Sequence, residues 1–323
     1  MTKTPNGGFL VSGTKGVFKT DSSGSLLWDY SVFLGGAFSA RQAVDGSVIV
    51  TGPGASGGTG DLFVVKIKSD DGSKSTENTT CFGNKTTTDN TTTSTWTKQL
   101  GTSSQDEGMG VTTDSSGNIY VTGYTKGDLD GNTSSGNRDI FLVKYNSSGA
   151  KQWTKQLGTS TFERGDKVTT DSSGNIYVTG YTDGDLDGNT SSGGSDIFLI
   201  KFNSSGTKIW TKQLGTSKDE EAFEVTIDSS GNIYISGYTE GGLDGNTNSG
   251  RSDIFLVKYN SSGTKQWTKQ LGTSSVDKGR GVTTDSSDNI YVTGGTDGDL
   301  DGNTNSGSVD IFLVKYNSDG VKQ

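Results

Sequence analysis

The sequence predicts an all-β fold, and three observations support that prediction. The chain has 50 glycines and 2 prolines but only 28% apolar residues. Those apolar residues gather in short β-branched and aromatic runs, with no helical periodicity. A unit of 57 residues recurs four times. Short apolar runs separated by Gly, Asn and Ser indicate many short strands joined by tight turns.

The repeat is marked by four tryptophans that lie 57 residues apart and open the same phrase, WTKQLGTS. The copies cover residues 96–152, 153–209, 210–266 and 267–323, and the first two differ at only 13 of 57 positions. Copies this similar arise by duplication, so we expect them to share one packing arrangement. Residues 96–323 are therefore predicted to form four equivalent units of one propeller.

Each copy is expected to contribute four strands. In the first copy we expect them near 110–114, over 119–124, over 139–145 and over 151–157. The intervening tight turns carry Gly and Asn, which adopt positive φ at little cost.

The third strand of each copy is apolar on both faces. Ile140 and Leu142 point one way, whereas Phe141, Val143 and Tyr145 point the other. A strand of this kind must be covered on both sides. Because no helix is predicted, only other sheets can cover it, which indicates a β-propeller of about six four-stranded blades. A linear β-solenoid is disfavoured because its repeat is much shorter than 57 residues.

The remaining third of the chain is a divergent version of the same pattern. Residues 1–74 are predicted to form divergent N-terminal blades, the first without its inner strand. Residues 75–95 are rich in Thr and Asn and are expected to form a disordered insertion within the second blade. The last blade is expected to lack its outer strand. Closure by a shared blade and truncation of a longer array both remain compatible with this pattern.

Three phrases of the repeat resemble the bacterial β-propeller repeat called SBBP. They are DSSGNIYVTGYT at 114–125, LDGNTSSG at 129–136 and DIFLVKYNSSGAKQW at 139–153. The resemblance is strong over 96–323 and loose over 1–74. It implies a secreted or cell-surface bacterial protein and no assigned activity. The Thr-rich insertion departs from the family pattern, and no export signal is visible in this chain, since residues 1–11 lack an apolar core.

Composition excludes several function classes. The net charge of −9, from 37 acidic and 28 basic residues, argues against a nucleic-acid partner. No run approaches the roughly 18 apolar residues of a membrane span. With no histidine and Cys81 as the single cysteine, zinc, haem and iron–sulfur sites are not expected.

Binding is expected at the propeller face that carries the long loops. In the first copy these are the loop 125–138 and the connecting loop 101–108, which lie at the same end of the sheet. Four acidic residues share one position of the connecting loop and are predicted to contact a ligand or protein partner. They are Asp106, Glu163, Glu220 and Asp277.

The phrase LDGNT in the long loop suggests calcium, which takes six to eight oxygen ligands. The candidate ligands are Asp128, Asp130, Asn132, Asp185, Asp187, Asn189, Asp299, Asp301 and Asn303. No cofactor is required by the repeat, and the alternative is that these side chains cap a turn through their own backbone.

Two further repeat features have structural explanations. The tryptophans are expected to pack in the core rather than to stack on sugars. The aspartates that precede each SSGN turn are expected to open the turn. Met109, Lys126 and Arg138 differ between copies and receive no role.

The protein is expected not to be an enzyme, because near-identical repeats give their acids equivalent surroundings and a catalytic pair needs different ones. The preferred function is an extracellular or cell-surface scaffold that contacts a protein or glycan through an acidic long-loop face. A lectin with one sugar site per blade and a structural subunit of a surface assembly are alternatives. A polysaccharide-active enzyme is the least favoured of them.

Overall fold

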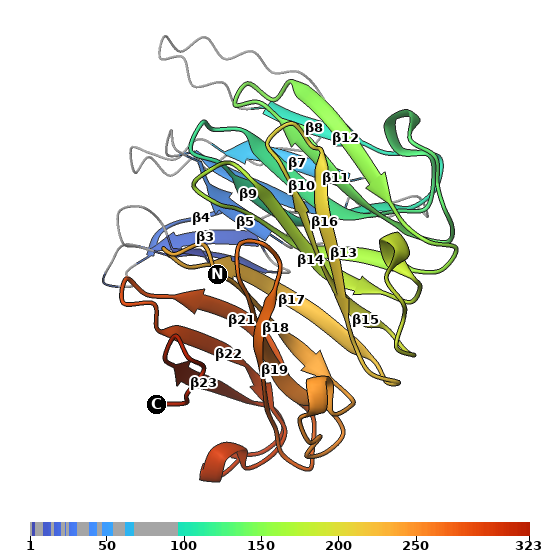
Figure 1. Cartoon of the computed structure of the whole chain (residues 1–323). Helices are drawn as coiled ribbons and strands as arrows, with labels where there is room; N and C mark the ends of the chain where they lie inside the picture. The colour runs from blue at the N-terminus through green and yellow to red at the C-terminus, as the bar shows by residue number, and fades with distance from the viewer. Residues whose placement is uncertain are drawn as a thin grey trace.

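The computed structural model describes residues 2–3, 9–13, 16–20, 23, 26–30, 39–43, 47–53, 62–67 and 96–323. Within these residues the elements are strands and four short 3₁₀ turns, arranged as successive antiparallel sheets (Figure 1). The predicted all-β fold of four-stranded sheets in tandem is confirmed. Residues 75–95, the expected disordered insertion, lie outside the described residues.

Two sheets precede the repeats. The first contains β1 (Thr2–Lys3), β2 (Phe9–Gly13), β3 (Gly16–Thr20) and β4 (Leu26–Tyr30). The second contains β5 (Ser39–Gln42), β6 (Val48–Pro53), β7 (Leu62–Ile67) and β8 (Trp96–Leu100). The first sheet therefore has a short inner strand, β1, where the sequence analysis expected none.

The repeats form the remaining sheets. The third contains β9 (Asp106–Thr113), β10 (Ile119–Thr125), β11 (Asp139–Tyr145) and β12 (Lys151–Leu157). The fourth contains β13 (Glu163–Thr170), β14 (Ile176–Thr182), β15 (Asp196–Phe202) and β16 (Lys208–Leu214). The fifth contains β17 (Glu220–Ile227), β18 (Ile233–Thr239), β19 (Asp253–Tyr259) and β20 (Lys265–Leu271). The last contains β21 (Asp277–Thr284), β22 (Ile290–Thr296) and β23 (Asp310–Tyr316). The 3₁₀ turns are η1 (Leu129–Gly131), η2 (Leu186–Gly188), η3 (Leu243–Gly245) and η4 (Leu300–Gly302).

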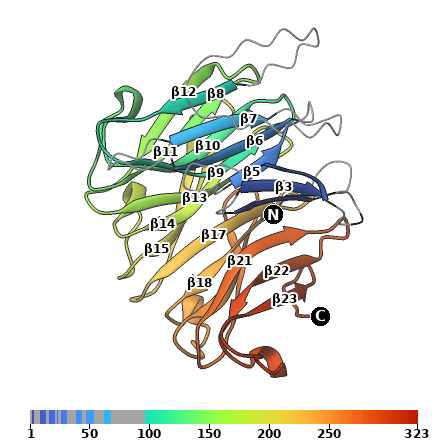
Figure 2. The same ribbon diagram turned by 180° about the vertical axis from the view of Figure 1, so that it is seen from behind.

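In each sheet the strands pair in chain order, and the first strands line the middle of the molecule. Strands β5, β9, β13, β17 and β21 pack against one another, each on the first strand of the next sheet (Figure 2). These first strands are longer than expected, since β9 begins at Asp106 and not near 110.

The turn-opening aspartates act as predicted. Asp114 accepts hydrogen bonds from the backbone N–H groups of Ser116 and Asn118, both at 2.9 Å, and from the hydroxyl of Tyr120 at 2.9 Å. The following Gly117 has φ 77°, the conformation that such a turn requires. Asp171, Asp228 and Asp285 make the same contacts in the other copies.

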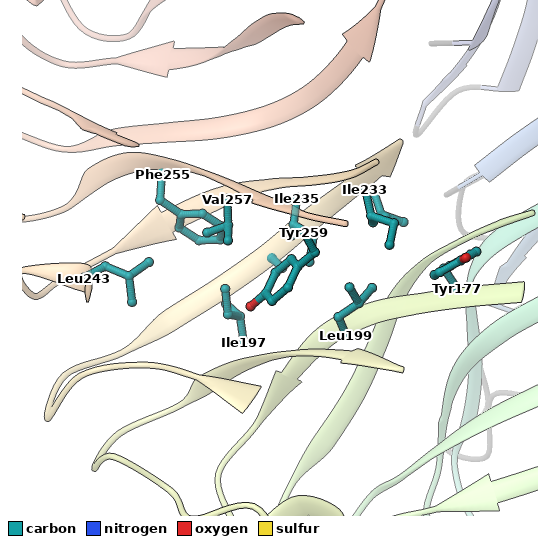
Figure 3. Packing of buried hydrophobic residues seen from close by; sticks show 11 residues of the cluster. Tyr177, Ile197, Leu199, Ile233, Ile235, Leu243, Phe255, Val257 and Tyr259 are labelled. Atoms are coloured by element: carbon teal, nitrogen blue, oxygen red, sulfur yellow. The ribbon is translucent and has the colours of Figure 1, made fainter. Parts of the chain in front are cut away.

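The hydrophobic core is divided into clusters that lie between neighbouring sheets. In one of them Ile197 and Leu199 of β15 meet Ile233 and Ile235 of β18, together with Phe255 of the same sheet (Figure 3). The tryptophans pack against these clusters, one for each, as Trp96, Trp153, Trp210 and Trp267. Their predicted role in core packing is confirmed.

The last sheet departs from the prediction that every third strand is covered on both faces. Ile254 and Leu256 in β19 are 3% and 1% exposed, but the equivalent Ile311 and Leu313 in β23 are 92% and 71% exposed. No other described sheet covers this flank of DIFLVKY, which is open to solvent. The same sheet has three described strands. Among the described strands, the first and last sheets do not pack extensively on each other.

Candidate functional site

The two loops expected to share one end of the sheets do lie together. The backbone N–H of Lys126 donates to the carbonyl of Gln105 at 3.0 Å, which joins the long loop to the connecting loop. Arg138, at the other end of the long loop, donates through its backbone N–H to the carbonyl of Thr161 in the next copy. The long-loop end is therefore a continuous surface that crosses from one repeat to the next.

The four connecting-loop acids are not on that surface. Asp106, Glu163, Glu220 and Asp277 are each 0% exposed. Glu163 accepts hydrogen bonds from the backbone N–H of Thr159 at 2.8 Å and from three threonine hydroxyls at 2.6 to 3.1 Å. Such bonds hold the loop to the sheet. The four carboxylates therefore have a structural role, and in this position they offer a partner no accessible oxygen.

Two of the buried acids, Glu163 and Glu220, each lie next to a second buried carboxylate from the preceding sheet. Asp139, 0% exposed, accepts hydrogen bonds from the backbone N–H of Ser135 and from the side chain of Gln156 through Oδ2. Its Oδ1 has no hydrogen-bond partner. A Cβ on Gly158 would collide with this oxygen and lie 2.9 Å from Oε2 of Glu163, so only glycine fits between the two carboxylates.

The same pair recurs in the next junction as Asp196 and Glu220. Burial raises the pKa of both carboxyl groups above their ordinary values, against the hydrogen bonds that favour the ionised forms. The charge of Asp196 contributes to the raised pKa of Glu220.

The LDGNT side chains form contacts within or beside their own loop. Asp128 accepts the backbone N–H of Ser134 at 2.7 Å, Asp130 forms an ion pair with Lys151, and Asn132 donates to the carbonyl of Leu129 at 2.8 Å. Asp185, Asp187, Asn189, Asp299, Asp301 and Asn303 make the equivalent contacts. Asp130 adopts φ 56°, a conformation that Asp tolerates better than most residues. The described residues contain no group of three acidic, histidine or cysteine side chains that could hold a metal, so calcium binding stays a prediction.

The clearest differences between repeats lie in the first strands. Each first strand has a β-bulge, in which one residue has no partner on the neighbouring strand. The four bulge residues are Met109, Asp166, Phe223 and Arg280, which share neither charge nor shape. A bulge redirects a side chain and is frequent beside functional sites.

Glycine opposite the bulge makes this geometry possible. A Cβ on Gly123 would overlap the carbonyl of Glu107 and lie 3.0 Å from the Cα of Gly108. The same conflict recurs at Gly180, Gly237 and Gly294. All four copies therefore keep the same backbone arrangement at the bulge, while the bulge residue differs in every copy.

The residues around each bulge vary in the same way, and together they form what we call the bulge surface. It consists of Glu107, Met109, Arg164, Asp166, Lys167, Glu221, Phe223, Glu224, Lys278 and Arg280. Apart from Asp166, these side chains are half-buried or exposed. Met109 received no role from the sequence alone, although alignment of the four copies shows that its position is variable.

Opposite charges on neighbouring first strands join the bulge surface into a network. Arg164 Nε lies 2.9 Å from Asp166 Oδ1, and Arg164 Nη2 lies 3.4 Å from Glu221 Oε2. Lys167 Nζ lies 3.0 Å from Glu224 Oε2. The network therefore crosses from β13 to β17.

Aromatic rings extend this network at the long-loop end. The guanidinium of Arg164 lies 4.8 Å from the ring of Tyr181, and Lys278 lies 3.7 Å from the ring of Tyr238. Tyr238 also donates its hydroxyl to Glu221 at 3.0 Å. These pairs of a cation and an aromatic ring give the bulge surface both charged and apolar groups, a composition found at protein–protein interfaces.

The pH dependence of stability tests the burial of Asp166. Burial raises the pKa of Asp166 to about 7, and the nearby Arg164 limits the rise. Between about pH 4 and pH 7 the Asp166 carboxyl group therefore keeps its proton in the native state and has lost it in the unfolded state. Its contribution to the free energy of unfolding is fully present below about pH 4 and is lost as the pH rises to about 7. We expect the melting temperature of Asp166→Asn to depend less on pH between 4 and 8 than that of the wild type. Asp297→Asn, at an exposed carboxylate, is the control, and equal pH dependence in both variants would contradict the assignment.

Comparison with known proteins places the repeats. A family model described as a beta-propeller repeat, SBBP, matches residues 95–130, 152–187, 209–244 and 266–301. Each match begins one residue before a tryptophan that opens a copy. The matched segments contain every bulge residue, and each ends on the aspartate of an LDG turn.

Two curated proteins are similar in sequence. An uncharacterized WD repeat-containing protein of Acanthamoeba polyphaga mimivirus is 25% identical over 205 residues, which are 51% of this chain and 15% of that protein. Regulatory protein FlaEY of Caulobacter vibrioides is 27% identical over 237 residues, which are 64% of this chain and 25% of that protein. The chain thus spans a quarter or less of the length of these relatives.

A solved structure supports the fold. A protein of unknown function from Bacteroides caccae aligns over 97% of this chain and 93% of its own, with a TM-score of 0.52 and 11% identity. At this identity the likeness concerns the fold alone. Among the residues that the structure describes, no helix has the length and apolar character needed to cross a membrane.

Proposed function

We propose that this chain, in which four tandem segments between residues 95 and 301 match the SBBP beta-propeller repeat, is a non-catalytic scaffold that binds a protein partner through the bulge surface. The described sheets follow one another in a propeller-like array, and the repeats give it size and rigidity. The proposal includes a secreted or cell-surface location in a bacterium, in line with the family resemblance of the repeat.

One observation carries the proposal. Copies that agree at most positions differ in every bulge residue, and the differing side chains stand side by side across four sheets. Packing alone would keep one residue at an equivalent position, as it does for Leu142, Leu199 and Leu256 in the third strands. A surface in which each copy supplies a different group fits one asymmetric partner.

The relatives are consistent with this reading. One is named as a WD repeat-containing protein and the other as a regulatory protein, and neither name describes a catalytic reaction. The non-catalytic part of the proposal also rests on the absence of histidine from the sequence and on the engagement of Asp166 by Arg164.

Selection from a random peptide display library on the full chain tests the proposal. Reversing one ion pair, as in Lys167→Glu with Glu224→Lys, keeps the 3.0 Å pairing but exchanges the charges on β13 and β17. We expect selected peptides to bind this double variant at least about tenfold more weakly than the wild type, the scale of a modest interface change.

The matched control changes charge at the opposite end of the sheets. Thr207→Glu with Thr264→Lys alters two exposed residues of the tight turns and should leave peptide binding unchanged. Equal loss in both variants, or no enriched peptide at all, would remove the bulge surface as a protein site. Binding to a glycan array instead of peptides would favour the lectin alternative.

A further inference from the structure

The last sheet presents an uncovered apolar surface, which we call the open face. It consists of Thr293 in β22 and of Val309, Ile311 and Leu313 in and beside β23. The three apolar side chains are 63%, 92% and 71% exposed. Thr293 is also exposed and is the register partner of Leu313. Contiguous exposed apolar side chains of this kind mark interaction surfaces in soluble proteins.

The chain itself shows what covers this surface when it is occupied. Ile254 and Leu256 of β19 lie in one cluster with Val282, Ile290 and Val292 of the next sheet. The two preceding junctions repeat the arrangement. Ile197 and Leu199 meet Ala222, Val225 and Ile235, and Ile140 and Leu142 meet Val168, Ile176 and Val178. The complement of the open face is thus the first two strands of another sheet of this fold.

The residue before the third strand extends each junction. Arg138 lies over the ring of Phe162 at 5.6 Å and forms a parallel bridge with it, and Ser252 forms the same bridge with Val276. In both cases the partner belongs to the connecting loop of the following sheet. Val309 occupies this position in the last copy and presents an apolar side chain, so its complement is an apolar residue.

The first sheet is the other end of the array. Strand β2 packs on β5 of the second sheet, and among the described strands no other sheet packs extensively on β1–β4. Each described sheet after the first packs its first strand on the sheet before it, so among the described sheets the first is the one whose first strand meets no preceding sheet. We propose that the open face binds a second copy of this chain, which docks head to tail through its first sheet.

Sedimentation of the full chain over a range of concentrations tests this proposal. We expect the mass to rise above the 33.8 kDa of one chain as the concentration increases. The double variant Ile311→Glu with Leu313→Glu should raise the apparent dissociation constant at least about tenfold. Both side chains are exposed, so the variant keeps its fold. Ile209→Glu, at a 50% exposed isoleucine of β16, is the control and should associate like the wild type. A single chain at every concentration, or association that the double variant leaves unchanged, overturns the proposal.

Mixing distinguishes head-to-tail docking from contact between two open faces. A tagged double variant still carries its first sheet, so it should bind untagged wild type and limit the growth of larger assemblies. If two open faces bound each other, the double variant could not join the wild type. Failure of the tagged variant to retain wild type therefore overturns the head-to-tail arrangement. The bulge surface is unchanged in these variants, so this outcome is independent of the proposed function.

Discussion

Leu256→Ala is expected to lower the free energy of unfolding by about 2–5 kcal/mol, the cost of deleting a fully buried leucine side chain. In solutions dilute enough to keep the chain monomeric, Leu313→Ala should change it by less than about 0.5 kcal/mol, as for an ordinary surface substitution. The two leucines hold the same position in identical DIFLVKY strands, β19 and β23. Because Leu256 is 1% and Leu313 is 71% exposed, the pair separates the effect of burial from that of local sequence.

Urea unfolding followed by tryptophan fluorescence measures this difference, because each of the four repeat tryptophans packs against one of the inter-sheet clusters. Calorimetry of the same variants shows whether the sheets unfold together or in parts, as arrays of repeats can do. Similar losses in the two variants would mean that another molecule or segment covers the open face in solution.

Gly237→Ala is expected to cost about 3 kcal/mol, at the upper end for forcing an extra group into a packed site. Its Cβ would overlap the backbone carbonyl of Glu221 and lie 2.9 Å from the Cα of Ala222. Neither atom can move without disturbing the bulge that positions Phe223. The loss is measured as the shift of the urea midpoint at constant slope.

A glycine in the same repeat supplies the control for this substitution. Gly245 in η3 has φ 79°, and nothing lies within 4 Å of a Cβ built on it. Gly245→Ala therefore costs only the left-handed backbone conformation, about 1–2 kcal/mol. If Gly245→Ala proved the more damaging of the two, steric conflict at the bulge would not be the reason for glycine at 237.

The connecting-loop acids show where residue type alone misleads. Glu163 stands in a polar, Thr-rich loop and was expected to face a partner, yet its oxygens are fully used by Thr159, Thr161 and Thr182. A one-dimensional pattern records that threonines are near in sequence. It does not show that Thr182, nineteen residues later, donates a hydrogen bond to the Glu163 carboxylate.

The bulge surface could have been found in part from the sequence. The column of Met109, Asp166, Phe223 and Arg280 is visible once the four copies are aligned by their tryptophans. The alignment does not give the strand register. In that register the bulge residues have no partner on the second strand, and Gly123 and its equivalents lie opposite the bulge. A bulge is a property of a pair of strands, so it emerges only when both are placed.

The sequence by itself determined the strands of the repeats and their order, because period-two patterning and turn residues act over a few positions and recur in four copies. Tertiary structure alone decided which loop acids are buried, which residues bulge and where the array stays open. These depend on the neighbouring sheet: Ile254 and Ile311 have the same local sequence, and only the former has a sheet packed against it.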